Sequence, residues 1–431
     1  MTVTKRQTNL ALLLLFGINF MNIYDRTVVG AIGEKIKAEW LLSDAQLAGL
    51  TTAFILLYAI VGIPLGRVAD VGSRKRVLAM SVVVWSIFTG LSGVAGSFTA
   101  MIAYRLGVGV GEAGAAPASN SLIGDLFPPS KRAHAIGVFM LGVPFGIGAS
   151  FLISGLVVQW TGGWRPALFV AAVPGLILGA LALTLPEPAR GASDPDVVNR
   201  TMSAVDSIKS VLRTPTMWWI IASGALFNLN MYAINSFHTS FLIRFHGLNI
   251  DVANRFGGVI FGIGGGLGMF GGGWLADRAA KRGPRARMQL SVVALLITAP
   301  ILAIAMSRPR GDYWMFASLM FIGIATMYMY YSSTYATIAD IVPPQLRGMA
   351  MSVYFFVFYV FTAIGLFGFG KFSDARAAAA VARGATAVDS RAYGLHDALS
   401  TVPVICICVA IVLWIGSRSV ERDHARVRAN V

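Results

Sequence analysis

Charged side chains lie inside two apolar stretches of the sequence, and these residues could do chemistry. Asp25 and Arg26 stand side by side in the segment NFMNIYDRTVV. A later stretch contains Arg105 and Glu112, whose spacing of seven places both on one helix face. Arginine suits the capture of an anionic head group, and a carboxylate can take up a proton when substrate draws its guanidinium partner away. If both stretches are membrane-spanning helices, Asp25 and Arg105 lie at matching depth, roughly 10 Å inside the same surface, so the charges of the first can meet those of the second. These residues therefore predict substrate binding by the two arginines and proton coupling by Glu112, with Asp25 as second candidate.

Polar side chains also follow one face of two later apolar stretches, at spacings of three and four residues that are typical of a helix. They are Asn228, Tyr232 and Asn235 in residues 217–244, and Tyr328, Tyr331 and Tyr335 in residues 313–339. We interpret them as substrate-binding side chains, although the tyrosines could instead be packing residues or part of an interfacial aromatic belt. Charge in the first half and aromatic surface in the second would suit an amphipathic anion.

The elements that position these residues are predicted to be transmembrane helices. Of the 431 residues, 56% are hydrophobic and 13% are charged, whereas an ordinary soluble chain has about a quarter charged residues. Apolar blocks of about 20 residues, each long enough to cross a bilayer, recur along the chain. We identify twelve spans: residues 8–32, 45–69, 77–97, 99–124, 132–157, 164–184, 217–244, 252–276, 288–306, 313–339, 348–371 and 396–417. The sequence predicts an all-α integral membrane protein.

The net charge of +15 raises the question of nucleic-acid binding. With twelve spans, most of the 35 Lys and Arg residues fall in loops on the side of the N-terminus, an excess typical of cytoplasmic loops. The positive charge therefore indicates topology and not nucleic-acid binding. We expect a multi-pass protein of the plasma (inner) membrane, monomeric, with both termini in the cytoplasm.

No motif indicates a cofactor, a metal or an enzymatic site. Cys406 and Cys408 are two residues apart in the last span and point to different helix faces, which suits neither a metal site nor a disulfide. The phosphate-binding pattern G-x-x-x-x-G-K-[ST] does not occur, which argues against transport powered by this chain's own ATP hydrolysis. We expect no metal, no cofactor and no catalytic residues.

Two motifs occur twice, in the same order and at nearly the same offset. DLFPPSKRAHAIGV at Asp125 recurs as DIVPPQLRGMAMSV at Asp340, and GRVADVGSRKR at Gly66 recurs as GWLADRAAKRG at Gly273. This repetition indicates an internal duplication of six spans. We therefore predict two six-helix bundles, residues 1–185 and 216–431, joined by a polar cytoplasmic linker, residues 186–215.

With these motifs, the chain resembles the major facilitator superfamily (MFS), whose loop between helices 2 and 3 reads G-x-L-A-D-R-x-x-R-K. The first copy matches at Gly66, Val68, Ala69, Asp70, Arg74 and Lys75, with Val71 in place of the usual Arg, and the second at Gly273, Leu275, Ala276, Asp277 and Arg278. The resemblance covers essentially the whole chain. It implies the MFS fold, in which twelve helices form two pseudo-symmetric bundles and helices 1, 4, 7 and 10 line a central cavity.

The loop motif also predicts gating residues. Asp70 would end the second helix, where the helix dipole disfavours an acid unless it meets Arg74 or the start of helix 11 near Arg347. The resemblance implies that this contact closes the cytoplasmic gate. Asp277, followed by Arg278, would act in the same way against helix 5.

Within the superfamily, Y-D-R late in the first helix and R-x-x-x-G-x-G-E-A at residues 105–113 resemble the Spinster lipid transporters. The anion:cation symporters share much of the second pattern. The resemblance implies a secondary active transporter that moves a lysolipid- or sphingolipid-like anion by alternating access with proton coupling. The alternative is a proton-coupled symporter of small organic anions such as sugar acids. A channel is less favoured because the charge is asymmetric between the halves, and an intramembrane enzyme because no catalytic constellation is found.

Overall fold

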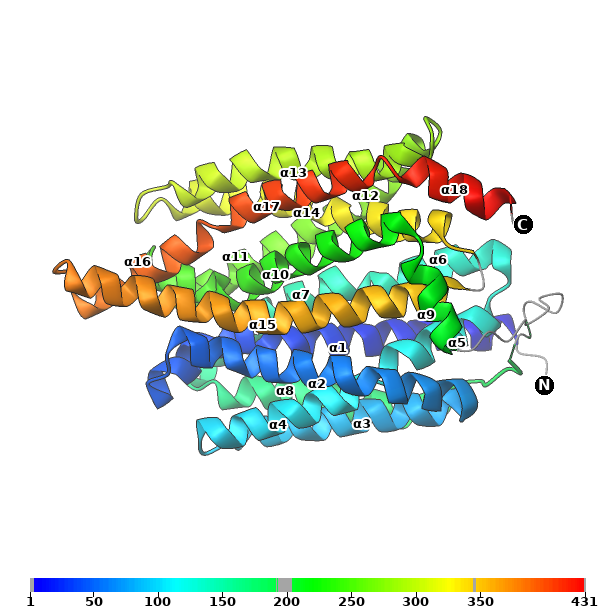
Figure 1. The fold of residues 1–431 in the computed structure, drawn as a ribbon. Helices are drawn as coiled ribbons and strands as arrows, with labels where there is room; N and C mark the ends of the chain where they lie inside the picture. The colour runs from blue at the N-terminus through cyan, green and yellow to red at the C-terminus, as the bar shows by residue number, and fades with distance from the viewer. Residues whose placement is uncertain (1–3, 191, 193–203, 344–345, 430–431) are drawn as a thin grey trace. The chain divides into compact units, whose positions relative to one another are not determined.

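The computed structural model describes residues 4–190, 192, 204–343 and 346–429, which fold into helices without a strand (Figure 1). The helices are α1 (Lys5–Trp40), α2 (Asp44–Val71), α3 (Arg74–Gly93), α4 (Phe98–Glu112), α5 (Ala115–Leu126), α6 (Pro129–Met140), α7 (Gly142–Thr161), α8 (Arg165–Ala182), α9 (Ala204–Leu212), α10 (Pro215–Arg244), α11 (Ile250–Gly257), the π-helix η1 (Gly258–Gly264), α12 (Gly265–Ala280), α13 (Pro284–Met306), α14 (Tyr313–Ile341), α15 (Arg347–Ala382), α16 (Ala387–Leu399), α17 (Val402–Gly416) and α18 (Val420–Ala429). All twelve predicted spans coincide with helices, so the predicted all-α fold is confirmed.

Within the described residues, 11 helical segments are long and apolar enough to cross a membrane. The predicted span 99–124 is not among these 11 segments, because it is divided into two shorter helices, α4 and α5, at Ala113–Gly114. Both pieces pack on α3. A Cβ atom added to Gly111 would lie 2.4 Å from the backbone nitrogen of Trp85, so this approach requires glycine. The glycines of this segment therefore permit close helix packing.

Two helices extend well beyond the spans predicted from hydropathy. α1 continues past residue 32 and stops at Leu41, whose φ of 52° is left-handed. Lys37 near the end of α1 forms a buried ion pair with Asp44 at the start of α2. α15 continues past residue 371 and packs against α16. Hydropathy marks the apolar part of a helix, whereas the helix itself continues until the backbone is redirected.

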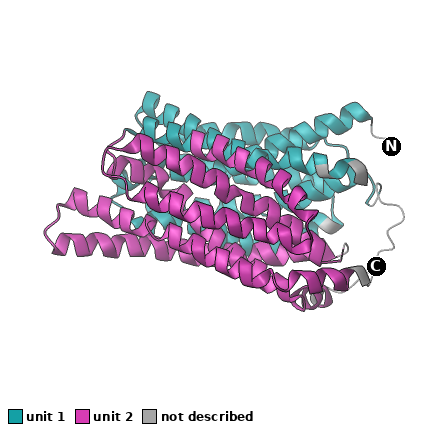
Figure 2. Ribbon diagram, turned by 90° about the horizontal axis from the view of Figure 1, so that it is seen from above, with its two compact units in different colours: residues 1–198, 249–258 teal, residues 199–248, 259–431 magenta. Residues whose placement is uncertain are grey.

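The chain forms two compact units, which Figure 2 distinguishes by colour. Unit 1 comprises residues 1–198 and 249–258, and unit 2 comprises residues 199–248 and 259–431. The short segment 249–258 clusters with unit 1 because α11 packs on α7, and Asn254 Nδ2 donates a hydrogen bond of 3.1 Å to the Ala31 carbonyl. In unit 1, α1 packs on α7 and α8, and α4 packs on α2 and α3.

In unit 2, α14 packs on both α12 and α13, and α10 packs on α15 and α17. The contact between α12 and α14 is very close, because a Cβ atom added to Gly268 would lie 2.0 Å from the Ala325 carbonyl oxygen. This approach brings Tyr328 of α14 against the glycine-rich face of α12. The packing thereby fixes the helix face that carries the predicted tyrosines.

Candidate functional site

Four charged residues of α1 and α4 form two ion pairs in unit 1, and we call them the charge quartet: Asp25, Arg26, Arg105 and Glu112. Arg105 Nη1 donates to Asp25 Oδ1 at 3.2 Å, and Arg26 Nε donates to Glu112 Oε2 at 2.7 Å. The prediction that the charges of the first span meet those of the fourth is confirmed. Arg105 and Glu112 are seven residues apart, roughly 10 Å along a helix, so the two neighbours on α1 reach different depths of α4.

The charge quartet is almost completely buried. The exposed fractions of the side chains are 8% for Arg26, 2% for Asp25, 1% for Arg105 and 0% for Glu112. Isolated charges at such positions are strongly destabilising, and a balanced set of two acids and two bases offsets much of that penalty. Glu112 Oε1 and Arg105 Nε are buried and form no hydrogen bond within the described residues. The quartet therefore keeps one acceptor and one donor available to water or a ligand.

Side chains from α2 and α3 complete the surroundings of the quartet, and the sequence analysis missed them. Thr89 donates its hydroxyl to Asp25 Oδ2. The Arg26 guanidinium carbon lies 4.4 Å from the centre of the Tyr58 ring, and that of Arg105 lies 5.3 Å from the centre of the Phe54 ring. Such cation–π contacts stabilise a desolvated guanidinium by about 2 kcal/mol. The helical spacing of polar residues around Thr89 was the available signal in the sequence.

The first copy of the loop motif is organised around Arg74, the first residue of α3. Its guanidinium pairs with Asp125 and donates to the Pro188 carbonyl. Its backbone nitrogen donates to Glu187 Oε1 at 2.5 Å. Arg74 has an exposed fraction of 1%. Its buried side chain therefore connects α3 to the end of α5 and to the chain that follows α8. The side chain of Asp70 lies outside the described residues, and its gating role stays a prediction.

Part of this arrangement recurs in unit 2, with an arginine that lies just beyond the second copy of the loop motif. Arg287 of α13 pairs with Asp340 at the end of α14, and its Nη2 lies 3.7 Å from Asp277 Oδ1. The Arg278 guanidinium stacks over the Trp274 ring at 3.4 Å. In both halves, an arginine at the start of one helix binds the aspartate that opens the repeated D-x-x-P-P motif. The two repeated motifs thus form one structural element, and gating by Asp277 and Arg278 stays a prediction.

Unit 2 brings together part of the predicted polar face. Tyr331 donates its hydroxyl to Asn228 Oδ1 at 3.0 Å, and Asn228 Nδ2 donates to the Gly224 carbonyl at 2.8 Å. The rings of Tyr328 and Tyr331 are 5.7 Å apart, and those of Tyr331 and Tyr335 are 5.8 Å apart. The contacts between α10 and α14 therefore join Asn228 to the tyrosine face of α14. We call Tyr328, Tyr331 and Tyr335 the tyrosine cluster.

The other two predicted residues of α10, Tyr232 and Asn235, are half-buried. Asn235 Nδ2 donates to the Met231 carbonyl at 2.9 Å. Asn235 Oδ1 is buried and accepts no hydrogen bond within the described residues. Asn235 thus keeps an acceptor available on the same helix as Asn228.

The sequence analysis also missed aromatic residues that pack on the tyrosine cluster. The Tyr330 ring stacks on Phe227 at 3.9 Å, and its hydroxyl lies 2.9 Å from Ser223 Oγ. Tyr354 of α15 lies edge-on to Tyr335 at 6.0 Å. The aromatic run YFFVFY at residues 354–359, interrupted by Val357, was the signal for α15. Its residues become neighbours of α14 only through the packing of unit 2.

The described residues contain no group of three or more His, Cys, Asp or Glu side chains that could hold a metal ion. Cys406 is buried and receives a contact of 3.4 Å from Asn230 Nδ2, whereas Cys408 is exposed. The two thiols point to different surroundings, as their spacing predicts.

Comparison with known proteins places this architecture among transporters. Residues 15–366 match the family model of the Major Facilitator Superfamily. An MFS-type efflux pump of Mycolicibacterium smegmatis is 29% identical over 409 residues, which cover 94% of this chain and 92% of that protein. Protein spinster homolog 3 of Danio rerio is 34% identical over 222 residues, covering 51% of this chain and 45% of that protein.

A solved structure shows the same fold. It is the crystal structure of a bacterial homologue of the human lysosomal transporter Spinster in an inward-facing, unoccupied conformation. The alignment has a TM-score of 0.86 and 27% sequence identity, and it covers 98% of this chain and 99% of that chain. The resemblance to the Spinster proteins that the sequence motifs indicated is confirmed.

Proposed function

Since the chain belongs to the major facilitator superfamily, it is a multi-pass membrane transporter of the Spinster type rather than an enzyme, and we propose that it moves an amphipathic anion by proton-coupled alternating access. The observation that carries this proposal is the charge quartet. Its two acids and two arginines are buried together, and each carboxylate is held by one guanidinium. A buried and balanced set of this kind can exchange a partner for a ligand, because any change in one pair leaves a charge to be compensated.

Anion capture is the first proposed step. Guanidinium groups stay protonated and bind phosphate or carboxylate oxygens through paired hydrogen bonds. Arg105 Nε makes no hydrogen bond within the described residues, so this side chain keeps a donor for the substrate head group. Arg26, held on the Tyr58 ring, is the second proposed anion-binding residue.

Proton uptake is the second proposed step. Arg26 Nε lies 2.7 Å from Glu112 Oε2, and the Glu112 side chain has no exposed surface. If the anion draws Arg26 away, this buried carboxylate loses its positive partner. A proton on Glu112 then restores neutrality, and its release would accompany the return of Arg26. We propose the same linkage, in a secondary role, for Asp25 and Arg105.

The apolar part of the substrate is assigned to unit 2. The tyrosine cluster, with Asn228, Tyr232 and Asn235, offers aromatic surface together with a few hydrogen-bonding groups. Aromatic side chains provide large apolar contact areas, and the free acceptor of Asn235 can bind a donor on the substrate. This combination suits a lysolipid- or sphingolipid-like molecule better than a fully polar solute.

Transport in sealed vesicles tests the proposal. Purified protein in proteoliposomes should accumulate labelled lysolipid, and vesicles preloaded with unlabelled substrate should show counterflow. A channel would show no counterflow, and an enzyme would change the substrate chemically. Accumulation of a short sugar acid, without a response to lysolipid, would favour the alternative of a small organic-anion symporter.

We further propose that the protein acts as a monomer in the plasma (inner) membrane with both termini in the cytoplasm. The support is the excess of Lys and Arg in the loops on the N-terminal side. Labelling of single cysteines introduced near residues 5 and 420 in intact cells tests this orientation. Reaction with an impermeant reagent before cell lysis would contradict it.

A further inference from the structure

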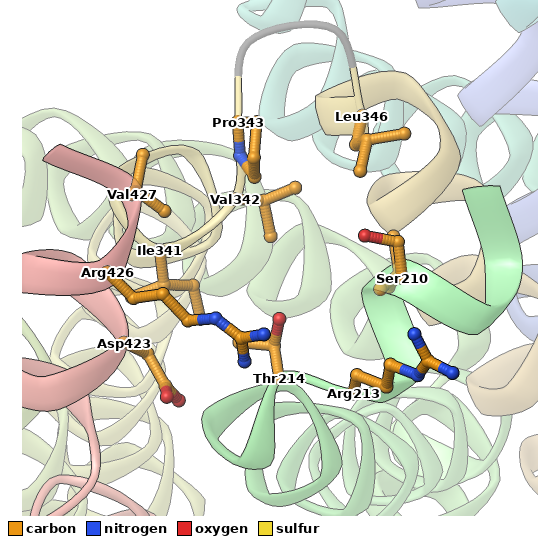
Figure 3. A pocket seen from close by; sticks show the side chains of 11 residues that line it. Ser210, Arg213, Thr214, Ile341, Val342, Pro343, Leu346, Asp423, Arg426 and Val427 are labelled. Carbon is orange, nitrogen blue, oxygen red and sulfur yellow. The ribbon is translucent and has the colours of Figure 1, made fainter. Parts of the chain in front are cut away.

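A cavity of about 150 Å³ opens at one end of unit 2, where α9, α14, α15 and α18 come together (Figure 3). None of its lining residues belongs to the charge quartet or the tyrosine cluster, and the proposed transport step does not use it. The cavity brings α9 and α18 to the end of α14. A ligand here would contact three helices that are distant in sequence.

All polar side chains of the cavity except that of Asp423 can donate hydrogen bonds. In Figure 3 the hydroxyls of Ser210 and Thr214 and the guanidinium of Arg426 point toward its interior, while the guanidinium of Arg213 points away from it. Arg213 and Arg426 are exposed, and neither forms an ion pair within the described part of the chain. The Arg426 guanidinium thus faces the cavity without a carboxylate partner in the described residues, and Arg213 adds a second positive charge nearby.

Asp423 also lines the cavity, but its carboxylate is already bound. Its Oδ2 accepts hydrogen bonds from the Thr216 backbone nitrogen at 2.9 Å and from Thr216 Oγ1 at 2.6 Å. These bonds attach α18 to the first turn of α10, and Asp423 has an exposed fraction of only 3%. Because Asp423 is held in this way, it leaves the guanidinium of Arg426 available.

The remaining wall of the cavity is apolar. Val211, Ile341 and Val342 line it, and each has an exposed fraction of 1%. A wall of this kind excludes water on one side, which strengthens the attraction between the guanidinium groups and an anion. The cavity therefore combines a low-dielectric wall with positive charge and two hydroxyl donors.

We propose that this cavity binds a phosphate group, supplied either by an anionic lipid head group or by a soluble phosphate ester. A phosphate has several acceptor oxygens and carries no donor when ionised, so it matches the Arg426 guanidinium and two hydroxyls. A carboxylate has only two oxygens and would leave part of this donor set without a partner. The predicted topology puts this end of unit 2 in the cytoplasm beside the membrane, where both phosphate sources are present.

Binding of a soluble phosphate ester tests the proposal in the full chain. The dissociation constant of glycerol 3-phosphate would be measured by thermal unfolding of protein purified in a phosphate-free detergent. Arg426→Ala should weaken binding by about tenfold or more, because it removes charge-assisted hydrogen bonds. Ser210→Ala should weaken it less. Arg418→Ala, which removes the same charge from an exposed position that does not line the cavity, is the matched control.

A lipid measurement distinguishes the two phosphate sources. The protein would be placed in nanodiscs of phosphatidylcholine with added phosphatidylglycerol. Native mass spectrometry of the protein released from these nanodiscs would count the phosphatidylglycerol molecules that stay bound to it. Phosphatidylglycerol that is lost from Arg426→Ala but still bound to Arg418→Ala supports a lipid head group. Binding of glycerol 3-phosphate alone, with the same dependence on Arg426, supports a soluble ester. Equal behaviour of the two variants toward both ligands, or no binding of either ligand to the wild type, overturns the proposal.

Discussion

Arg26 of α1 and Glu112 of α4 form a buried ion pair, with 2.7 Å between Nε and Oε2, although 86 residues separate them in the chain. The second carboxylate oxygen of Glu112 accepts no hydrogen bond within the described residues. Glu112 is thus held by one arginine on one side and is open to a proton on the other. This geometry makes it the residue at which anion binding and proton binding can be linked.

Glu112→Gln mimics the protonated carboxyl group and should separate binding from coupling. We expect the variant to bind substrate, because the amide occupies nearly the same volume and Arg26 stays available for the anion. Accumulation driven by an imposed pH gradient should be lost in proteoliposomes. Asp25→Asn, measured in parallel, should give a weaker form of this defect. If proteoliposomes with Glu112→Gln still accumulate substrate under a pH gradient, Glu112 is not the coupling residue and Asp25 becomes the leading candidate.

Arg105→Ala should affect both ligand binding and stability. Binding of an anionic substrate should fall more than binding of a neutral analogue, because the variant removes a charge that the anion uses. The buried Asp25 would also lose its partner, which destabilises a protein by roughly 3–5 kcal/mol. Thermal unfolding and binding of the two ligands would be measured. The double variant Arg105→Ala/Asp25→Asn should recover stability without recovering anion binding, and equal losses for both ligands would make Arg105 structural only.

The two copies of the arginine–aspartate element should differ in their contribution to stability. Arg74 has a side-chain exposure of 2% and Arg287 of 19%. Arg74→Ala removes a buried guanidinium together with its ion pair to Asp125, and it should cost about 3 kcal/mol or more. Arg287→Ala breaks a more exposed pair and should cost about 1 kcal/mol. Thermal unfolding of both variants in the same detergent checks this order, which a larger effect at Arg287 would reverse.

His246 follows α10 outside the membrane-spanning segment Pro215–Arg244 and should make stability depend on pH. Burial lowers the pKa of His246 to about 4, with an opposing influence of Asp312 and a further lowering by His396. The ordinary pKa of histidine is about 6.5. Between these two values the unfolded chain binds a proton that the folded chain does not, so stability should fall as the pH falls from about 6.5 to about 4.

His246→Phe tests this dependence. The histidine ring contacts Phe241 at 5.4 Å and Phe316 at 5.1 Å, so a phenyl ring suits its surroundings. The unfolding midpoint of the variant should depend less on pH between about 4 and 6.5 than that of the wild type. The same slope in both proteins would show that other groups cause the pH dependence.

The sequence alone determined that the chain is an all-α membrane protein, because hydrophobicity and span length are local properties of the chain. It also predicted that the charges of the first span meet those of the fourth, since helical rise puts Asp25 and Arg105 at one depth. The arginine–aspartate elements were visible only as repeated motifs, at Asp125 and Asp340. Nothing in those motifs said that the two aspartates bind Arg74 and Arg287.

Only the tertiary structure decided which charge binds which, because pairing depends on how each helix is rotated about its axis and how far each side chain reaches. Arg26 binds Glu112 and not the acid beside it in the chain. Asp25 binds Arg105 and accepts a hydrogen bond from the Thr89 hydroxyl. The placement of Tyr58 under Arg26 follows from the packing of α2 on α1 and α4. These contacts join residues far apart in sequence, and hydrophobic periodicity carries no record of them.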